Sequence, residues 1–556
     1  MLVALLPVHV AQACSAFIVG KDLTADGSTL FGRTEDYPYA PDGGRHNQNY
    51  VVVPAKTYKD GDKIEDESNG FTYPHLANEM KYTAVYDSDR DNGSNGNFAA
   101  HGFNELGVAM TATVSATPND KVLKEDPLVK DGLPEASLVD LALPRAKTAR
   151  EVIETVAKVL DEKGSAEGNI IVAADKNELW YMEILSGHQY VAIKFPTNKY
   201  AVFANTYYLG HVDLNDKENV IASKDVEEVA KKADNYKTDK DGNFMIAKSY
   251  GPDKYMERNR SRTYAGIKWM DPQAKVNYDD EAFDLLREPT DPNKKYTVHD
   301  VIAEQRNRFE HLPEYKADDL VEVGKKIDGN VYKYALGNEN VIDAHVYQIK
   351  PNLPNAFGGV MWLGLAQSRN TPYVPFYGNV EDTYEAFKNR STKYDGKSWY
   401  WTVWHIDQMV MKYPEIFGNS IQEKWKAKEA EWDKEQTERD AKYANYTDEQ
   451  AKAAGPEVTK EALERSEKIF KEIKAVEAEM EEKIKKEKGK DADLVYTGYN
   501  KANLLAEAEK GKSADKASDT KKDSSSQTTW IVIGVLVVLV AGFFGYKQFN
   551  KKKEEE

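Results

Sequence analysis

Cysteine is nearly absent from this sequence: Cys14 is the only one among 556 residues. A single cysteine excludes an intramolecular disulfide and a cysteine-rich zinc site. The ten histidines are scattered and show no HExxH or HxxEH spacing, so no known metal-binding pattern is present. We therefore expect no metal and no other cofactor, with the alternative of a metal site assembled from residues that are distant in the sequence left open.

Clustered positive charge is also missing from most of the chain. The formal net charge is -17, and no long basic patch precedes residue 547. Binding to nucleic acid depends on clustered Lys and Arg side chains that contact phosphates, so we exclude a nucleic-acid partner. Hydrophobic residues make up 41% of the sequence and tyrosine occurs 33 times, a composition typical of a globular protein with a sizeable core.

Apolar runs stand out at the two ends of the chain. Residues 2–10 (LVALLPVHV) are apolar and precede Ala11-Gln12-Ala13, an A-x-A cleavage signal. Removal of residues 1–13 as a leader would make Cys14 the first residue of the mature chain. The leader has no Lys or Arg before its apolar run, so it is either atypical or the end of a longer leader. The alternative is a buried N-terminal strand.

The second apolar run covers residues 530–546 (WIVIGVLVVLVAGFFGY) and contains no charge. Its length is close to the minimum of about 17 residues for a membrane-spanning helix. Lysines follow it directly within residues 547–556, and positive charge favours the cytoplasmic side. We expect one C-terminal transmembrane helix, a cytoplasmic tail, and a protein body outside the cell membrane, in agreement with the leader.

Three zones lie between the ends. Residues 14–415 mix strand-like and helix-like patterns and form the expected catalytic domain. Residues 419–489 are rich in Glu, Lys and Ala, which favours helices, and Gly455-Pro456 divides them. Because their apolar stripe is thin, we expect a solvated helical stalk. Residues 508–529 are rich in Ser, Lys and Asp and are expected to be a flexible linker.

Strand patterns surround the cysteine. Residues 14–20 (CSAFIVG) and 28–33 (STLFGR) flank the turn signal Asp26-Gly27, which predicts a β-hairpin. Its second strand would carry Arg33 and Asp36 back toward Cys14. Further strands are expected at residues 107–114 and in a pair formed by residues 169–174 and 179–185.

An N-terminal cysteine has a nucleophile and a base on one residue. The thiolate attacks carbonyl carbon well, and the free α-amine has a reference pKa of about 8, so it can accept a proton near neutral pH. This pair suits amide hydrolysis through an acyl-thioester. The alternatives for Cys14 are attachment of a lipid and a structural role in the core.

Several blocks of the sequence resemble the dipeptidase A family of N-terminal-nucleophile cysteine peptidases. The blocks are residues 14–20, Asp26 to Thr29, Arg33-Thr34-Glu35-Asp36, residues 102–113, residues 175–188 and residues 361–377. The resemblance covers roughly residues 14–415. It implies an α+β fold, a four-layer αββα sandwich of two antiparallel sheets shared with penicillin V acylase and bile salt hydrolase. It also implies hydrolysis of dipeptides without a metal.

The resemblance also implies roles for individual residues. Cys14 would be nucleophile and base, Arg33 and Asp36 would steady it, Asn205 would help to form the oxyanion hole, and Arg262 would complete the set. The related acylases have a second asparagine where this chain has Thr111-Ala112-Thr113, so a backbone N–H or Thr113 would be the second donor. The alternatives are a surface ion pair for Arg33 and Asp36 and a turn for Asn205.

Three functions follow from the sequence as hypotheses. The first is a surface-tethered dipeptidase that takes small peptides, with Glu35, Asp36 or Glu183 as partner of the substrate amine. The second is an acylase that cuts N-acyl amides, and the third is a non-catalytic binding protein of the cell surface. The sequence leaves a monomer and a homo-oligomer equally open.

Overall fold

The structure is a computed structural model that describes residues 14–37, 47–87, 98–112, 114–312, 325–327, 330–332 and 335–498. The expected leader, Thr113, the linker, the transmembrane helix and the cytoplasmic tail lie outside these ranges. Within them, no helix combines the length and the apolar character that crossing a bilayer requires. The leader and the anchor therefore stay predictions.

Six antiparallel strands form a sheet that we name the Cys14 sheet, because Cys14 directly precedes its strand β1. Its strands, in spatial order, are β14 (Tyr200–Phe203), β1 (Ser15–Val19), β2 (Thr29–Asp36), β18 (Val341–Ile349), β19 (Val360–Leu365) and β20 (Val374–Tyr377). The predicted hairpin is confirmed, since β1 and β2 pair with Ala16 opposite Arg33. Its connection is longer than a tight turn and contains a short 3-10 helix, Lys21–Leu23.

Eight antiparallel strands form the second sheet. In spatial order they are β15 (Val220–Ala222), β13 (Tyr190–Lys194), β12 (Leu179–Ile184), β11 (Asn169–Ala174), β10 (Ala109–Ala112), β9 (Ala99–Asn104), β8 (Tyr82–Asp87) and β3 (Gln48–Val53). The predicted pair of strands in residues 169–174 and 179–185 is confirmed as β11 and β12. The strand predicted within residues 107–114 is β10.

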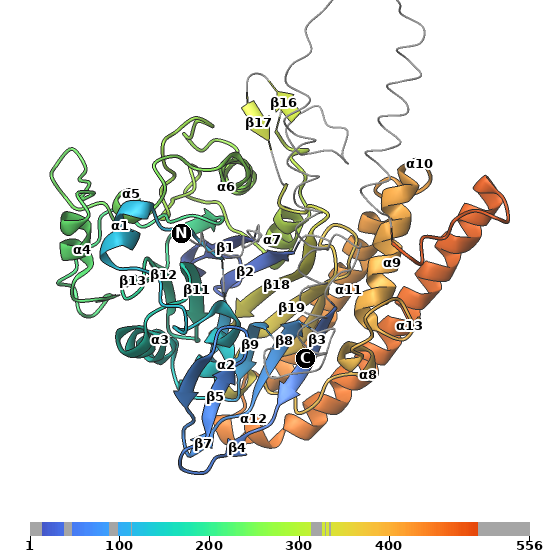
Figure 1. Ribbon diagram of the computed structural model, residues 1–556. Helices are drawn as coiled ribbons and strands as arrows, with labels where there is room; N and C mark the ends of the chain where they lie inside the picture. The colour runs from blue at the N-terminus through green and yellow to red at the C-terminus, as the bar shows by residue number, and fades with distance from the viewer. Residues whose placement is uncertain are drawn as a thin grey trace, which may run out of the picture. The chain divides into compact units, whose positions relative to one another are not determined.

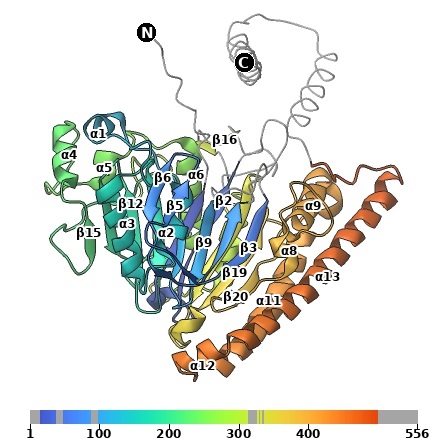
Figure 2. The same ribbon diagram turned by 60° about the horizontal axis from the view of Figure 1, so that its bottom comes forward.

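Helices cover the outer face of each sheet, which gives four layers. Helices α2 (Leu138–Ala142) and α3 (Ala149–Lys163) pack on the second sheet, and α6 (Glu257–Met270), α7 (Val298–Gln305) and α9 (Trp399–Lys412) pack on the Cys14 sheet. Figure 2 shows α2 and α3 on one side of the strands and α9 on the other. The αββα arrangement implied by the resemblance is thus the observed one.

Alternation along β10 shows how one strand serves two layers. Met110 and Ala112 belong to the apolar core shared with α2 and α3, whereas Thr111 between them contacts Arg33 of the opposite sheet. Side chains of a strand point alternately to its two faces, so the second sheet is apolar toward its helices. Polar groups can consequently collect between the two sheets.

Helix α3 illustrates why the outer layer forms. Its buried residues recur every three or four positions and include Val152, Val156 and Leu160, which places them on one face. The Thr148 side chain caps the helix by accepting from the N–H of Glu151, and Gly164 ends it at a φ of +72°.

The remaining elements are smaller or peripheral: β4 (Lys56–Thr57), β5 (Lys63–Asp66), β6 (Phe71–Pro74), β7 (Asn78–Glu79), β16 (Lys325–Ile327), β17 (Asn330–Tyr332), α1 (Asp120–Glu125), α4 (Val226–Lys232), α5 (Ile246–Tyr250), α8 (Glu385–Lys388) and α10 (Pro414–Phe417).

The expected solvated stalk at residues 419–489 is wrong. This segment is helical, as α11 (Ser420–Tyr443), α12 (Asp448–Ala453) and α13 (Gly455–Lys488), and Gly455-Pro456 begins α13 as the sequence indicated. However, α11 packs on β20 and α13 packs on α9, so both belong to the outer layer (Figure 1). The compact unit extends to Gly498, well beyond the expected boundary at residue 415.

Polar residues make the contact that the thin apolar stripe did not reveal. The buried residues of α11 follow a helical spacing and include Trp425, Glu429, Trp432 and Asp440. The Trp425 indole donates to the carbonyl of Asn370 at 2.8 Å. Charged and amide side chains usually indicate a solvated face, so a helix that buries them against matching partners appears more exposed from its sequence than it is.

The strongest of these contacts is a buried ion pair between α11 and the end of α7. Arg306 donates from both terminal nitrogens to Glu429, at 2.8 Å and 2.5 Å, and the two side chains are 3% and 1% exposed. The N–H of Tyr373 donates to the same carboxylate at 2.9 Å. The carboxylate therefore links α11 to two other segments of the domain.

We expect Glu429→Ala to lower the free energy of unfolding by about 3–5 kcal/mol, because it leaves the Arg306 charge buried without its partner. Urea denaturation followed by circular dichroism measures this change. The matched control is Glu464→Ala, which removes an exposed i,i+4 pair with Lys460 and should cost less than about 1 kcal/mol. Equal effects of the two substitutions would contradict the integral packing of α11.

Candidate functional site

Cys14 lies at the start of the central hairpin of its sheet. Strand β1 runs between β2 and β14, with Ala16 opposite both Arg33 and Phe203. Because the neighbours are antiparallel, β2 ends and the segment after β14 begins beside Cys14. The pairing thus brings Arg33, Asp36 and Asn205 to one end of the sheet, where the sequence predicted them.

Arg33 contacts the sulfur of Cys14. Its Nη1 lies 3.4 Å from Sγ, and both side chains are almost completely buried, at 1% and 0% exposed. Nη2 donates to Glu35 Oε2 at 3.0 Å and to the carbonyl of Ala112 at 2.7 Å, and Nε donates to Thr111 Oγ1 at 3.0 Å. A planar guanidinium held at so many points has one orientation. The alternative of a surface ion pair is thereby excluded for Arg33.

Burial dominates the acidity of the Cys14 thiol. It raises the pKa of Cys14 to about 12, against the lowering effect of the Arg33 charge, and Glu35 raises it further. At neutral pH the thiol in this chain, where Cys14 still follows Ala13, is therefore protonated. A nearby base has to remove its proton before the sulfur can attack a carbonyl carbon.

Asn205 and Arg262 form a second arm of the site. Arg262 Nη2 donates to Asn205 Oδ1 at 2.8 Å and to Asn259 Oδ1 at 2.9 Å, and Asn259 Nδ2 donates to the Asn205 carbonyl at 2.6 Å. The amide oxygen of Asn205 is thus fixed, whereas its buried Nδ2 has no hydrogen-bond partner among the described residues. An oxyanion is stabilised by a hydrogen-bond donor that is already held in position, and the Asn205 side chain offers such a donor.

Arg262 also reaches Cys14 itself. Its Nη1 donates to the Cys14 carbonyl oxygen and, at 3.0 Å, to Ser15 Oγ. Burial lowers the pKa of Arg262, an effect that the charge of Asp36 opposes. Asp36 is buried at the end of β2, where Asn338 Nδ2 donates to its Oδ2 at 2.5 Å. All five residues selected from the sequence therefore lie around the start of β1.

The carboxylate that pairs with Arg33 is Glu35 rather than Asp36. Arg33 and Glu35 are two positions apart in β2, so their side chains lie on the same face of the strand, and Arg33 Nη2 is 3.0 Å from Glu35 Oε2. The charge of Asp36 instead acts on Cys14 and on Arg262. Of the candidate second oxyanion donors, Thr113 lies outside the described residues, and a backbone N–H stays a prediction.

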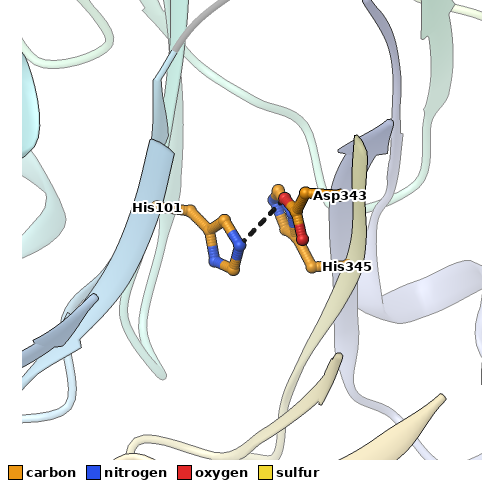
Figure 3. A group of neighbouring side chains, drawn as sticks. All are labelled: His101, Asp343 and His345. Carbon is orange, nitrogen blue, oxygen red and sulfur yellow. Dashed lines mark hydrogen bonds and ion pairs between the residues drawn. The ribbon is translucent and has the colours of Figure 1, made fainter. Parts of the chain in front are cut away.

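A histidine–aspartate cluster lies behind Arg33, between the two sheets (Figure 3). Asp343 Oδ2 is 3.1 Å from His101 Nε2 and 3.1 Å from His345 Nδ1, and the two imidazole rings stack with centroids 3.6 Å apart. Burial lowers the pKa of both histidines, that of His345 to about 3, and the imidazoles hold the pKa of Asp343 far below its usual range. The cluster is one carboxylate shared by two neutral imidazoles.

Two imidazoles and a carboxylate are also a donor set for a divalent metal. The candidate ligand atoms of His101, Asp343 and His345 lie within 4.8 Å of one another, and no other such group occurs among the described residues. The outward nitrogens bond Tyr347 OH at 2.7 Å and Thr111 Oγ1 at 3.0 Å. Since Thr111 also accepts from Arg33, the cluster is joined by hydrogen bonds to the group that touches Cys14.

Sequence reasoning missed these residues because their positions are separated along the chain. They come from strands β9 and β18, which belong to two different sheets. The one local signal is Asp343-x-His345, whose spacing of two places both side chains on one face of a strand. Asn104 makes a turn by accepting from the N–H groups of Leu106 and Val108. Four aromatic residues are buried in the core: Trp180, Trp362, Tyr373 and Tyr377.

Comparisons with known proteins identify the family of this chain. The family model described as "Peptidase family C69" matches residues 13–466, a range that includes α11, α12 and the first part of α13. A probable dipeptidase B of Streptococcus pyogenes serotype M1 is 48% identical over 486 residues, which cover 86% of this chain and 95% of the relative. A probable dipeptidase of Latilactobacillus sakei is 33% identical over 392 residues, 70% of this chain and 79% of the relative.

Among solved structures, a mutant of the conjugated bile acid hydrolase from Clostridium perfringens is similar to this chain. The identity is 14% and the TM-score is 0.24, with 64% of this chain and 89% of the hydrolase covered.

Proposed function

Because the chain belongs to peptidase family C69, we propose that it is a cysteine dipeptidase whose nucleophile is the thiol of Cys14. The single observation that supports this most is the contact of Cys14 Sγ with the buried Arg33, beside an Asn205 amide whose N–H is uncommitted among the described residues. Names of relatives from two genera point to dipeptides as substrates. Family membership makes the chain a peptidase and sets aside the alternative of a non-catalytic binding protein.

The reaction requires removal of residues 1–13. Cleavage after Ala13 would convert the amide nitrogen of Cys14 into a free amine with a pKa near 8. The amine accepts the thiol proton as sulfur attacks the scissile carbonyl carbon, and Asn205 Nδ2 donates to the resulting oxyanion. Collapse of the intermediate expels the C-terminal amino acid, whose nitrogen takes that proton, and leaves an acyl-thioester on Cys14. Water then attacks the thioester and releases the other amino acid.

The remaining residues hold these groups in place. Arg33 lies against the sulfur, where its positive charge stabilises the thiolate as it forms. Arg262 fixes both the Cys14 carbonyl and the Asn205 amide, so it keeps nucleophile and oxyanion donor at a constant separation. The negative charge of Asp36 acts on Cys14, where it would stabilise the ammonium form that the Cys14 amine takes during the reaction.

We expect Asn205→Ala to lower kcat for dipeptide hydrolysis by about 10²–10³-fold with KM nearly unchanged, because its N–H acts on charge that exists only after attack. Steady-state kinetics with a dipeptide measure both constants. An exposed asparagine of the same domain, Asn215, provides the control substitution Asn215→Ala, which should change neither. An unaltered kcat in a folded Asn205→Ala protein would remove Asn205 from the oxyanion site.

We further propose that the domain acts on the outer side of the cell membrane. The A-x-A signal before Cys14, the apolar residues 530–546 and the lysines that follow support this orientation. Protease added to intact cells should then release the peptidase domain, whereas deletion of residues 530–546 should release it without protease. Retention in the cytosol would contradict the proposal.

A further inference from the structure

Several buried carboxylates act on the nucleophile. The negative charges that act on the Cys14 thiol are those of Glu35, Asp36 and Glu135, with Glu35 the strongest. Burial raises the pKa of Glu35, Arg33 opposes this effect, and Asp87 and Asp343 add to it. Arg33 opposes them at the thiol, so Arg33 and Glu35 are the two charged side chains with the largest effect on Cys14.

Glu35 has a free acceptor in this interior. The side chain is 0% exposed, its Oε2 accepts from Arg33 at 3.0 Å, and its Oε1 has no hydrogen-bond partner among the described residues. A buried carboxylate oxygen without a donor is costly, which makes it a place where a ligand is expected to donate.

We propose that Glu35 binds the free α-ammonium group of the dipeptide and so restricts the enzyme to substrates with an unblocked N-terminus. This inference rests on the proposed dipeptidase function and adds to it the group that distinguishes a dipeptide from an N-acyl amide. The ammonium would donate to Oε1, and its positive charge would favour the ionised form of Glu35.

Substrate dimensions agree with the position of Glu35. The α-nitrogen of a peptide lies about 2.5 Å from its own carbonyl carbon. A sulfur poised to attack that carbon is roughly 3–3.5 Å from it, and a charge-assisted N–H···O bond adds about 2.8 Å. The carboxylate that binds the ammonium must therefore lie close to the sulfur, and Glu35 is separated from Cys14 Sγ by a single guanidinium group.

The other candidates from the sequence fit less well. Asp36 lies at the end of β2, where Asn338 donates to it and its charge acts on Cys14 and Arg262, so it serves the nucleophile. Glu183 Oε2 also has no hydrogen-bond partner among the described residues, but its Oε1 accepts from three donors, Tyr181 OH and the N–H groups of Tyr208 and Leu209, whereas Glu35 is paired with the arginine that touches Cys14. Glu183 is thus a structural carboxylate and a suitable control.

The test compares two substrates that differ only in the amine: alanyl-alanine and its des-amino analogue, propionyl-alanine. The mature wild-type enzyme should prefer alanyl-alanine by a kcat/KM ratio on the order of 10³ or more, because a site built for a buried charge rejects a ligand without it. In Glu35→Gln the ratio should fall to about 10 or less, mainly through loss of alanyl-alanine hydrolysis. Glu35→Asp should lie between them, and Glu183→Gln should keep the wild-type ratio.

The kcat/KM ratio distinguishes recognition of the substrate ammonium by Glu35 from an effect of Glu35 on catalysis through Arg33. If Glu35→Gln slows both substrates by the same factor, Glu35 acts only on the machinery and the ammonium site is overturned, while the dipeptidase function stands. A wild-type ratio near one would also overturn it. Failure of the folded, processed wild type to cleave either substrate would instead refute the proposed function itself.

A second measurement on the wild type does not depend on the folding of a variant. The amine of alanyl-alanine has a pKa near 8, so above that pH the charged substrate declines tenfold per unit. The kcat/KM ratio of alanyl-alanine to propionyl-alanine should therefore fall about tenfold per pH unit above about 8, since titration of the thiol and amine of Cys14, which act on both substrates, cancels in the ratio. A ratio that is constant up to about pH 10 would overturn the proposal.

Discussion

Replacement of Cys14 by alanine is expected to lower kcat for dipeptide hydrolysis by about 10⁵-fold or more, since the variant can form no acyl-thioester. The protein should nevertheless fold, because Cys14 is a small side chain at the edge of β1 and its removal leaves the ion pair of Arg33 with Glu35 intact. Kinetics of a chromogenic coupled assay, beside circular dichroism and urea denaturation, measure the two properties separately.

A serine variant provides the matched comparison. Cys14→Ser keeps the shape of the site and a nucleophilic atom, but the hydroxyl is far less acidic than the thiol, so its residual activity should stay near that of the alanine variant. Mass spectrometry of the wild type quenched during turnover should show an acyl adduct on Cys14. A folded alanine variant with wild-type activity would disprove the nucleophile.

Retention of residues 1–13 is expected to cost about 10³-fold or more in kcat/KM. An amide nitrogen accepts no proton, so the precursor lacks the general base. General acid–base catalysis contributes about 10²–10⁴-fold to the rate. Burial that raises the pKa of Cys14 to about 12 makes this loss severe, because the thiol of the precursor does not ionise by itself at neutral pH. An uncleavable leader, with Ala13→Pro as one choice, should therefore yield an inactive protein.

The control for this prediction is a chain in which the initiator methionine directly precedes Cys14 and is removed after synthesis. It should be active, and its kcat should rise with pH as the Cys14 amine, with a reference pKa near 8, loses its proton. Intact mass assigns the N-terminus of each sample. Full activity of a protein that retains residues 1–13 would contradict N-terminal-amine catalysis, whatever the role of the sulfur.

The hairpin and the helices show where prediction from sequence works. The turn signal at Asp26-Gly27 and the alternation beside it placed Arg33 next to Cys14, because pairing in an antiparallel hairpin is a local property. Helix propensity likewise identified α11 and α13. It did not reveal that Glu429 of α11 is buried, since the partner that permits its burial, Arg306, is more than a hundred residues earlier.

The sequence by itself predicted Cys14 as the nucleophile, placed Arg33 beside it, and predicted the residue types of the oxyanion arm. These follow from one cysteine behind an A-x-A signal, from local strand pairing and from a family resemblance. The tertiary structure decided which carboxylate faces Arg33, that Asn205 keeps a donor uncommitted among the described residues, and that His101, Asp343 and His345 meet behind the site. The physical reason is that burial and hydrogen-bond partners are set by which strands lie opposite one another across two sheets, and residue spacing along the chain contains no record of that contact.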